Sequence, residues 1–146
     1  MPELTLYEAL VGLFTSAFVS ATLFPGASEA VLLALISAWP EAIWLALAVA
    51  TVANTLGSMT SYVIGRFFPK KVSDQALQSI NCWGSWALFF AWLPVVGDAL
   101  PLAAGWLRIP WIKSSLLIFL GKGFRYTALA FGFLIFSNNI ESQSPP

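Results

Sequence analysis

Four charged side chains inside apolar segments are the first candidates for chemistry in this sequence. They are two acids, Glu29 and Asp98, and two bases, Lys122 and Arg125. Because an unpaired charge in hydrocarbon costs several kcal/mol, we expect the four to face one another or water. Such residues usually mark a substrate or proton pathway, in which an acid gains and loses a proton. The alternative is a neutral set of buried ion pairs that fixes helix register.

The two acids follow equivalent interruptions of apolar segments. Glu29 stands four residues after a proline in L-F-P-G-A-S-E, and Asp98 does the same in W-L-P-V-V-G-D. A helix that begins near Ala27 or Asp98 favours negative charge, so it would hold these acids ionised or attract a phosphate. Proline and glycine break helices, and paired breaks of this kind are typical of inverted-repeat transporters. The predicted re-entrant breaks are formed by Pro25, Gly26, Pro94 and Gly97.

The two bases lie three residues apart in the middle of the last apolar segment. Lys122 and Arg125 therefore share a helical face and can reach a common target. Arginine binds phosphate through a planar fork and lysine binds it as a point charge, so the pair suits a phosphate headgroup. Gly121 and Gly123 leave space beside them. Snorkelling toward an interface is the alternative for Arg125.

A polar stripe runs along one face of the first long apolar segment. Its members recur at helical spacing and are Thr51, Asn54, Thr55, Ser58, Ser61, Tyr62 and Gly65. This face should look inward, and Asn54 at mid-span is a further candidate to bind the headgroup. The stripe is equally a packing surface, because Gly57, Ser61 and Gly65 let a second helix approach closely.

The segments that position these residues form two similar series. Each series has two short apolar segments around a break, followed by one long enough to cross a bilayer, which takes about 20 residues. The segments are 4–24, 27–39 and 42–65 in the first half, and 82–93, 99–107 and 111–136 in the second. We predict an all-α, polytopic integral membrane protein with two re-entrant helical hairpins and two full spanning helices in an inverted repeat. In a rival topology, 4–24 crosses the bilayer completely.

Composition supports a single transmembrane domain over 1–146, with 58% hydrophobic and 10% charged residues. Its repeat halves are about 1–69 and 82–136, with a solvated loop or short helical turn at 70–81 and a disordered tail at 137–146. The absence of histidine and the single cysteine, Cys82, exclude a histidine-based triad, a histidine zinc site and an internal disulfide. We expect no metal, no cofactor and no enzyme activity. Zero net charge gives no reason to expect a nucleic-acid partner.

The remaining charges separate onto two surfaces if both short pairs are hairpins. One surface receives Arg66, Lys70, Lys71, Arg108 and Lys113, and the other receives Glu3, Glu8, Glu41 and Glu141. By the positive-inside bias, the basic surface is cytoplasmic and both termini lie outside. Arg66 and Arg108 are expected to act as interface anchors.

Four motifs occur in order along the chain. They are F-P-G-A-S-E at 24–29, Y-V-I-G-R-F-F-P at 62–69, W-L-P-V-V-G-D-A-L-P-L-A-A-G-W at 92–106 and L-G-K-G-F-R-Y at 120–126. Together they resemble the DedA family of membrane proteins (SNARE-associated, or VTT-domain, proteins), and most closely its YqaA-like branch. The resemblance implies a multi-pass inner-membrane protein with two facing re-entrant hairpins, linked to translocation of polyprenyl-phosphate and phospholipid carriers and to proton-motive force.

Carried over residue by residue, the family's acidic position falls on Glu29, and the second break falls on Pro94, Gly97 and Asp98. Better-known members have arginines three residues before and after the second-hairpin proline, where this chain has Ala91 and Gly97. Lys122 and Arg125 are hypothesised to replace those arginines.

The leading functional hypothesis is translocation of a lipid or lipid-phosphate headgroup across the inner membrane. The headgroup passes a polar cavity at the midplane, and Glu29 and Asp98 act as protonatable gates, which allows proton coupling. The expected partner is a membrane lipid with an anionic or phosphate headgroup. So small a bundle can use a second copy to enclose a cavity, which makes a homo-oligomer an open expectation. The rival hypothesis is a non-transporting membrane scaffold or envelope-homeostasis protein.

Overall fold

A computed structural model describes residues 5–21, 27–68, 74–93 and 96–141, and these residues contain no strand. The first half contains α1 (Leu6–Ser20), α2 (Ala27–Ala38), the 3₁₀ turn η1 (Pro40–Ala42) and α3 (Ile43–Phe67). The second half contains α4 (Asp74–Trp83), the 3₁₀ helix η3 (Gly84–Trp92), α5 (Val96–Trp106) and α6 (Trp111–Glu141). The all-α class predicted from the sequence is therefore confirmed for the described part of the chain.

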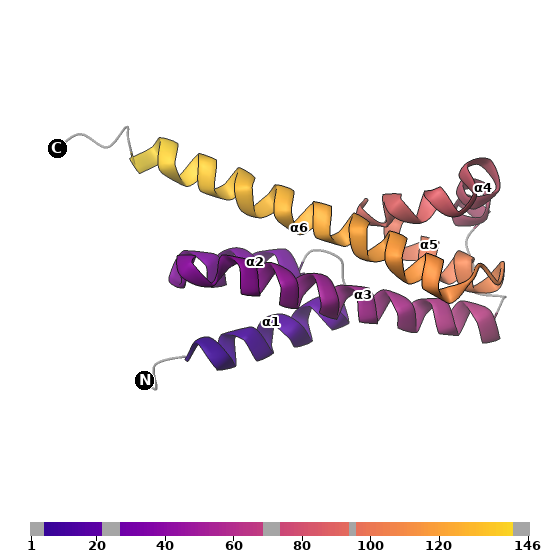
Figure 1. The fold of residues 1–146 in the computed structure, drawn as a ribbon, viewed down its shortest axis with the longest axis horizontal. Helices are drawn as coiled ribbons and strands as arrows, with labels where there is room; N and C mark the ends of the chain where they lie inside the picture. The colour runs from indigo at the N-terminus through magenta and orange to yellow at the C-terminus, as the bar shows by residue number, and fades with distance from the viewer. Residues whose placement is uncertain (1–4, 22–26, 69–73, 94–95, 142–146) are drawn as a thin grey trace.

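Two antiparallel helices, α3 and α6, run the length of the molecule (Figure 1). Near one end the hydroxyl of Tyr62 donates to the carbonyl of Ile109, 2.5 Å away, and near the other the rings of Trp44 and Phe131 meet edge to face. The segments 40–67 and 111–139 are long and apolar enough to cross a membrane. They match the two spans predicted from the sequence.

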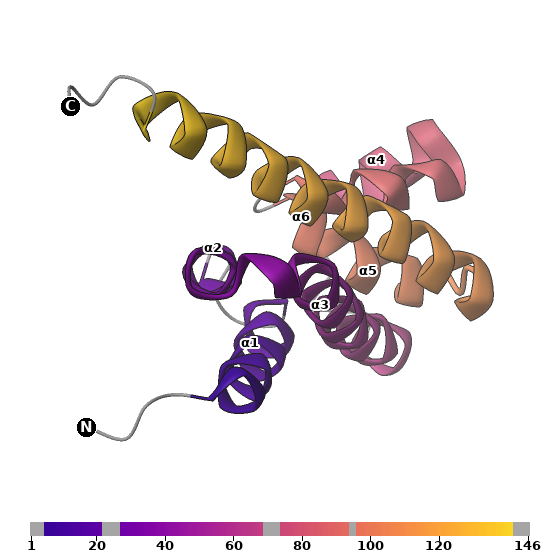
Figure 2. The same ribbon diagram turned by 60° about the vertical axis from the view of Figure 1, so that its left-hand side comes forward.

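The hairpin of α1 and α2 reaches only to the middle of these long helices. The end of α1 lies against mid-α3, where a methyl group on Gly57 would come within 2.7 Å of Ala21 Cβ. The start of α2 lies beside mid-α6, because the Ser28 and Tyr126 hydroxyls are 3.0 Å apart. Figure 2 shows α1 and α2 on one side of α3 and α4 and α5 on the other, with α6 crossing both groups.

Two glycines allow α3 and α5 to pack backbone against backbone. A side chain on Gly65 would collide with the carbonyl of Leu102, and one on Gly105 would collide with the carbonyl of Tyr62. The small-residue surface predicted on α3 is thus a packing surface that contacts two helices, α1 at Gly57 and α5 at Gly65.

The buried apolar residues form two clusters, one in each half of the molecule. The first cluster joins α1, α2, α3 and α6 around Leu32, Leu35 and Ala46. The second joins α3, α4, α5, α6 and η3 around Leu88 and Leu100. The long helices also carry exposed large apolar side chains such as Trp44 and Phe124. An outward apolar surface of this kind is what lipid chains require.

Among the described residues, the predicted surface charges outside the apolar segments lie near the two ends, as expected. Arg66 and Arg108 lie at the end where α3 finishes and α6 begins, and Glu8 and Glu41 lie at the other. Helix α4 lies toward the basic end (Figure 1), and its first residue, Asp74, is an acid that the predicted distribution omits. Lys70, Lys71 and Glu3 lie outside the described residues.

Some boundaries differ from those predicted. The polar run predicted as a solvated loop or short helical turn at 70–81 forms the longer helix α4 from Asp74, because its apolar positions recur at helical spacing on one face. The following apolar stretch is the 3₁₀ helix η3. Residues 137–141 were expected in a disordered tail, but they continue α6. Pro25, Gly26 and Pro94 lie outside the described residues.

The end of α5 is closed by a residue in the left-handed region, Arg108, with φ 54°. The amide of Ile109 donates to the carbonyl of Ala104 at 3.0 Å, and that of Arg108 donates to Gly105 at 3.1 Å, which together form a Schellman motif. The position normally suits glycine, because a Cβ atom in this conformation costs about 1–2 kcal/mol.

We predict that Arg108→Gly is more stable than Arg108→Ala by about 1 kcal/mol. Both changes remove the charge, so their difference isolates the backbone conformation. Thermal unfolding of the two variants in detergent measures it. An alanine variant at least as stable as the glycine variant would contradict the strained-cap explanation.

Candidate functional site

A buried network of neutral polar groups joins four helices at the middle of the molecule. Tyr126 of α6 and Ser28 of α2 have hydroxyl oxygens 3.0 Å apart, and Ser28 donates to Ser20 of α1 at 3.3 Å. The amide nitrogen of Asn54 on α3 donates to the Tyr126 hydroxyl at 2.8 Å and to the Ala17 carbonyl at 3.1 Å. These bonds fix the inner end of the hairpin to both long helices.

An ion pair between Glu29 and Arg125 lies beside this network. Glu29 is the third residue of α2 and Arg125 precedes Tyr126 on α6, so the pair bridges the same two helices. The helix dipole at the N-terminus of α2 favours the carboxylate. The Glu29 side chain is 26% exposed and the Arg125 side chain is 15% exposed. The pair is therefore largely shielded but can still be reached from outside the bundle. The prediction that the acids face the bases is confirmed for this pair.

Lys122 is buried one helical turn before Tyr126 on the same face of α6, and is only 1% exposed. Arg125 turns to Glu29, whereas Lys122 is enclosed within the bundle. The space expected at Gly121 is filled instead, because a side chain there would collide with the carbonyl of Phe89. A methyl group on Gly123 would contact Thr51 at 3.5 Å. The glycines therefore allow close packing around Lys122 and do not open a cavity.

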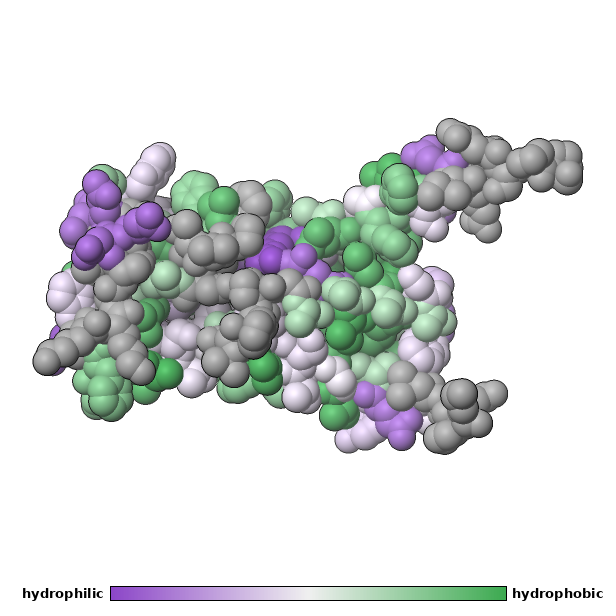
Figure 3. Space-filling model, turned by 180° about the vertical axis from the view of Figure 1, so that it is seen from behind, coloured by the Kyte–Doolittle hydropathy of each residue, from purple (hydrophilic) through white to green (hydrophobic). Residues whose placement is uncertain are grey.

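These side chains define a polar layer at mid-length of the molecule, and Tyr126 joins it to the first apolar cluster. Figure 3 shows hydrophilic surface at mid-length of the molecule, bordered by apolar surface. The polar layer consists of Ser20, Ser28, Glu29, Asn54, Lys122, Arg125 and Tyr126.

The second acid stands where the repeat predicts it in the chain. Asp98 is the third residue of α5, as Glu29 is of α2, and both helices begin after a proline-containing break. The surroundings of Gly97 and the side chain of Asp98 lie outside the described part of the structure. Whether Asp98 faces a base therefore stays a prediction.

The interface residues lie apart from the polar layer. Arg66 is exposed at the end of α3, where its guanidinium donates to the Tyr62 hydroxyl at 3.3 Å. Arg108 is exposed in the turn between α5 and α6. Their positions at one end of the molecule agree with the expected anchoring role.

Three members of the polar layer were not predicted from the sequence, namely Ser20, Ser28 and Tyr126. Each is a hydroxyl group inside an apolar segment, and Tyr126 stands four residues after Lys122 on the same helical face. That spacing could have indicated that Tyr126 belongs to the same site as Lys122. The partners of these hydroxyls depend on how the hairpin folds back, which no local pattern shows.

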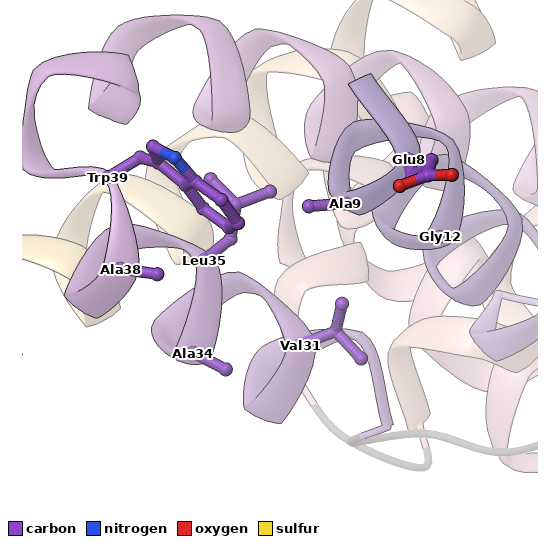
Figure 4. A pocket seen from close by; sticks show the side chains of 8 residues that line it. All are labelled: Glu8, Ala9, Gly12, Val31, Ala34, Leu35, Ala38 and Trp39. Carbon is purple, nitrogen blue, oxygen red and sulfur yellow. The ribbon is translucent and has the colours of Figure 1, made fainter. Parts of the chain in front are cut away.

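A groove of about 370 Å³ lies between α1 and α2, away from the polar layer. It is lined by Glu8, Ala9, Gly12, Val31, Ala34, Leu35, Ala38 and Trp39, as Figure 4 shows. Small and apolar side chains form most of its walls, and Glu8 is the charged residue among the described residues that line it. None of the predicted site residues that the structure describes lines this groove.

Removing the Tyr126 hydroxyl tests the neutral network. Tyr126→Phe keeps the ring but leaves Ser28 and Asn54 without this bonding partner inside the bundle, so we expect a loss of about 1–3 kcal/mol in unfolding free energy. Tyr7→Phe, on an exposed side chain, is the matched control. Equal stability of the two variants, measured by detergent unfolding, would show that the network contributes nothing.

Comparison with known proteins identifies relatives over most of the chain. It is 41% identical over 126 residues to the inner membrane protein YqaA of Escherichia coli K12, covering 84% of this chain and 89% of the relative. The Shigella flexneri protein of the same name matches equally well. An uncharacterized Haemophilus influenzae protein is 43% identical over 136 residues, covering 85% of this chain and 87% of the relative. No family model and no solved structure matches.

The relatives' names and the two long apolar helices agree with the predicted membrane location. The match to the Escherichia coli protein covers 84% of this chain, so it must include residues of both halves and extends far beyond the polar layer. This chain belongs to the family of the inner membrane protein YqaA.

Proposed function

We propose that this protein translocates a lipid or lipid-phosphate headgroup across the inner membrane. The observation that carries the proposal is the Glu29–Arg125 ion pair, which lies halfway along two long apolar helices and remains partly exposed. A charged pair at that depth is costly and usually functional. It offers a guanidinium that can bind a phosphate bidentately.

The ion pair supplies a way to bind and release the headgroup. Protonation of Glu29 removes the negative charge that holds Arg125, so the guanidinium becomes available to the anionic headgroup. Deprotonation restores the competing carboxylate and favours release of the phosphate. In this proposal Glu29 is the gate, and Asp98 has the same role at the second break.

The fold supports the proposed re-entrant topology. In this arrangement α1 enters from the surface that holds Glu8, ends at the polar layer, and α2 returns to the same surface. The α1 helix has 15 residues, fewer than the roughly 20 needed for a full crossing. We propose a DedA-type arrangement with the basic end in the cytoplasm, as the positive-inside bias favours.

The groove between α1 and α2 suits the lipid's acyl chain. Its walls are apolar, and its charged residue, Glu8, lies at the end of the hairpin near the expected headgroup region. A lipid whose chain rests in this groove has its headgroup within the leaflet from which the hairpin enters. The proposed path then leads from the groove to the polar layer.

Reconstituted vesicles test the proposal. Fluorescent phospholipids and polyprenyl phosphates, placed in one leaflet, should become accessible to an impermeant quencher on the opposite side faster with the protein than without it. Neutral-headgroup lipids provide the comparison for charge selectivity. Equal rates in protein-containing and empty vesicles for every lipid would contradict translocation.

A membrane scaffold is the second candidate, because Glu29 and Arg125 pair with each other and the neighbouring hydroxyls are hydrogen-bonded. In that case the charges only stabilise the fold. Glu29→Gln separates the two functions. A folded, inactive variant supports transport, whereas loss of the folded protein supports the scaffold.

A further inference from the structure

Two rows of buried side chains lie on α3 and α6, the two long helices, which contact each other. On α3, Asn54, Ser58 and Tyr62 are spaced four residues apart and lie on one face. Asn54 bonds to Tyr126 of α6, and Tyr62 bonds to the carbonyl of Ile109, two residues before α6 begins. Ser58 is buried one helical turn from each of them.

The row on α6 has the same spacing of four residues. It consists of Ser114, Ile118, Lys122 and Tyr126, all of which are buried. Ser114 belongs to the first turn of α6, at the basic end, and Tyr126 belongs to the polar layer. We call the contact between these two rows the polar seam. It runs from the basic end of the molecule to its middle.

Three polar atoms of the polar seam are buried without a hydrogen-bond partner among the described residues. They are Oδ1 of Asn54, Oγ of Ser58 and Oγ of Ser114. An unpaired buried hydroxyl or amide oxygen costs about 1–3 kcal/mol, so native proteins normally satisfy such groups with protein or water. Hydroxyls inside helices can bond to the carbonyl four residues back, as Thr55 does to Thr51 at 2.7 Å. Ser58 and Ser114 do not use that option.

We propose that the polar seam binds a file of internal water molecules that links Lys122 to the basic end of the protein. Water suits the seam because it can donate to all three oxygens and bridge from one to the next. The seam also contains the buried Lys122, and an ammonium group is strongly hydrated. The water file provides access to the polar layer from the side opposite to the α1–α2 hairpin. This inference does not depend on lipid translocation.

Two isoleucines provide a matched internal test. Ile118 lies in the polar seam, where it also packs in the second apolar cluster, and Ile36 lies in the first apolar cluster. Both are fully buried. Hydroxyl radicals generated within the membrane-embedded protein by a brief X-ray pulse oxidise side chains next to bound water. We expect Ile118 to be oxidised several times faster than Ile36, as measured by mass spectrometry of the peptides. Equal, low oxidation of both isoleucines would contradict a hydrated seam.

Thiol reactivity gives an independent test that does not rely on radical chemistry. In a Cys82→Ser background, Ser114→Cys and Ala130→Cys place thiols at two fully buried positions of α6, one in the seam and one in the first apolar cluster. A thiol without water stays protonated and unreactive. We expect N-ethylmaleimide to label Ser114→Cys at least about tenfold faster than Ala130→Cys. The reagent reacts with the thiolate, and lowering the thiol pKa by about one unit raises the thiolate fraction about tenfold.

A serine variant tests the water file if one of the introduced cysteines perturbs the fold. Ser58→Ala removes a buried hydroxyl while changing the volume little. If the seam is hydrated, this variant loses a water contact and its Ile118 oxidation falls relative to the native protein. If the hydroxyl is unpaired in a dry seam, the variant unfolds at a higher temperature and Ile118 oxidation does not change. The second result would overturn the proposal.

Discussion

Arg125→Met is expected to lower the unfolding free energy by about 2–3 kcal/mol. Methionine keeps much of the side-chain volume but leaves the Glu29 carboxylate without its cationic partner at the middle of the bundle. The figure lies below the 3–5 kcal/mol typical of fully buried pairs, because both side chains retain partial exposure. Titration with a denaturing detergent, followed by circular dichroism, measures the loss.

A second neutral substitution should restore most of this stability. Glu29→Gln combined with Arg125→Met leaves no charge at the position of the pair, so the double variant should be more stable than Arg125→Met alone. Arg66→Met, at an exposed cation near the end of α3, is the matched control and should change stability little. Additive losses in the double variant would show that the two side chains are not coupled.

Gly105→Ala is expected to have the largest effect on the fold. A Cβ atom at Gly105 collides with the carbonyl of Tyr62, and backbone groups have little freedom to move. Separating α3 from α5 disturbs the packing of the second apolar cluster, for which we expect a loss of at least about 3 kcal/mol. Reduced yield of folded protein and a lower unfolding temperature in detergent are the readouts. Gly65→Ala should behave similarly, because it meets the carbonyl of Leu102.

Gly132→Ala is the control for this prediction. Gly132 is exposed on α6, and an added Cβ atom meets nothing within 4 Å. Alanine is favoured over glycine inside a helix by about 0.5–1 kcal/mol, so this variant should be at least as stable as the native protein. Similar losses at positions 105 and 132 would contradict the close approach of α3 and α5.

The helices and their breaks were largely predictable because they depend on local sequence. Proline and glycine mark where apolar segments are interrupted, and length separates the two spans from the shorter helices. The start of α2 at Ala27 was predicted in this way. The length of α4 was underestimated, because polarity suggested a loop or a short helical turn, although polar residues are compatible with an amphipathic helix at a surface.

The partners within the polar layer were predictable only in part. The cost of a charge in an apolar segment required that Glu29 find a base, and Arg125 is that base. The choice between Arg125 and Lys122 could not be made, because it depends on how α2 crosses α6. The bonds of Tyr126 and the contact of Gly105 with α3 depend on long-range packing in the same way.

The initial rate of headgroup transfer in vesicles that contain Glu29→Gln, Arg125→Met tests the central proposal most directly. The substitutions remove the charged pair while keeping the neutral network, so folding can be verified by the unfolding temperature before transfer is measured. We predict that the folded double variant transfers an anionic phospholipid no faster than empty vesicles, while the native protein transfers it faster. Native transfer rates in the folded double variant would contradict the assignment of the Glu29–Arg125 pair as the headgroup site.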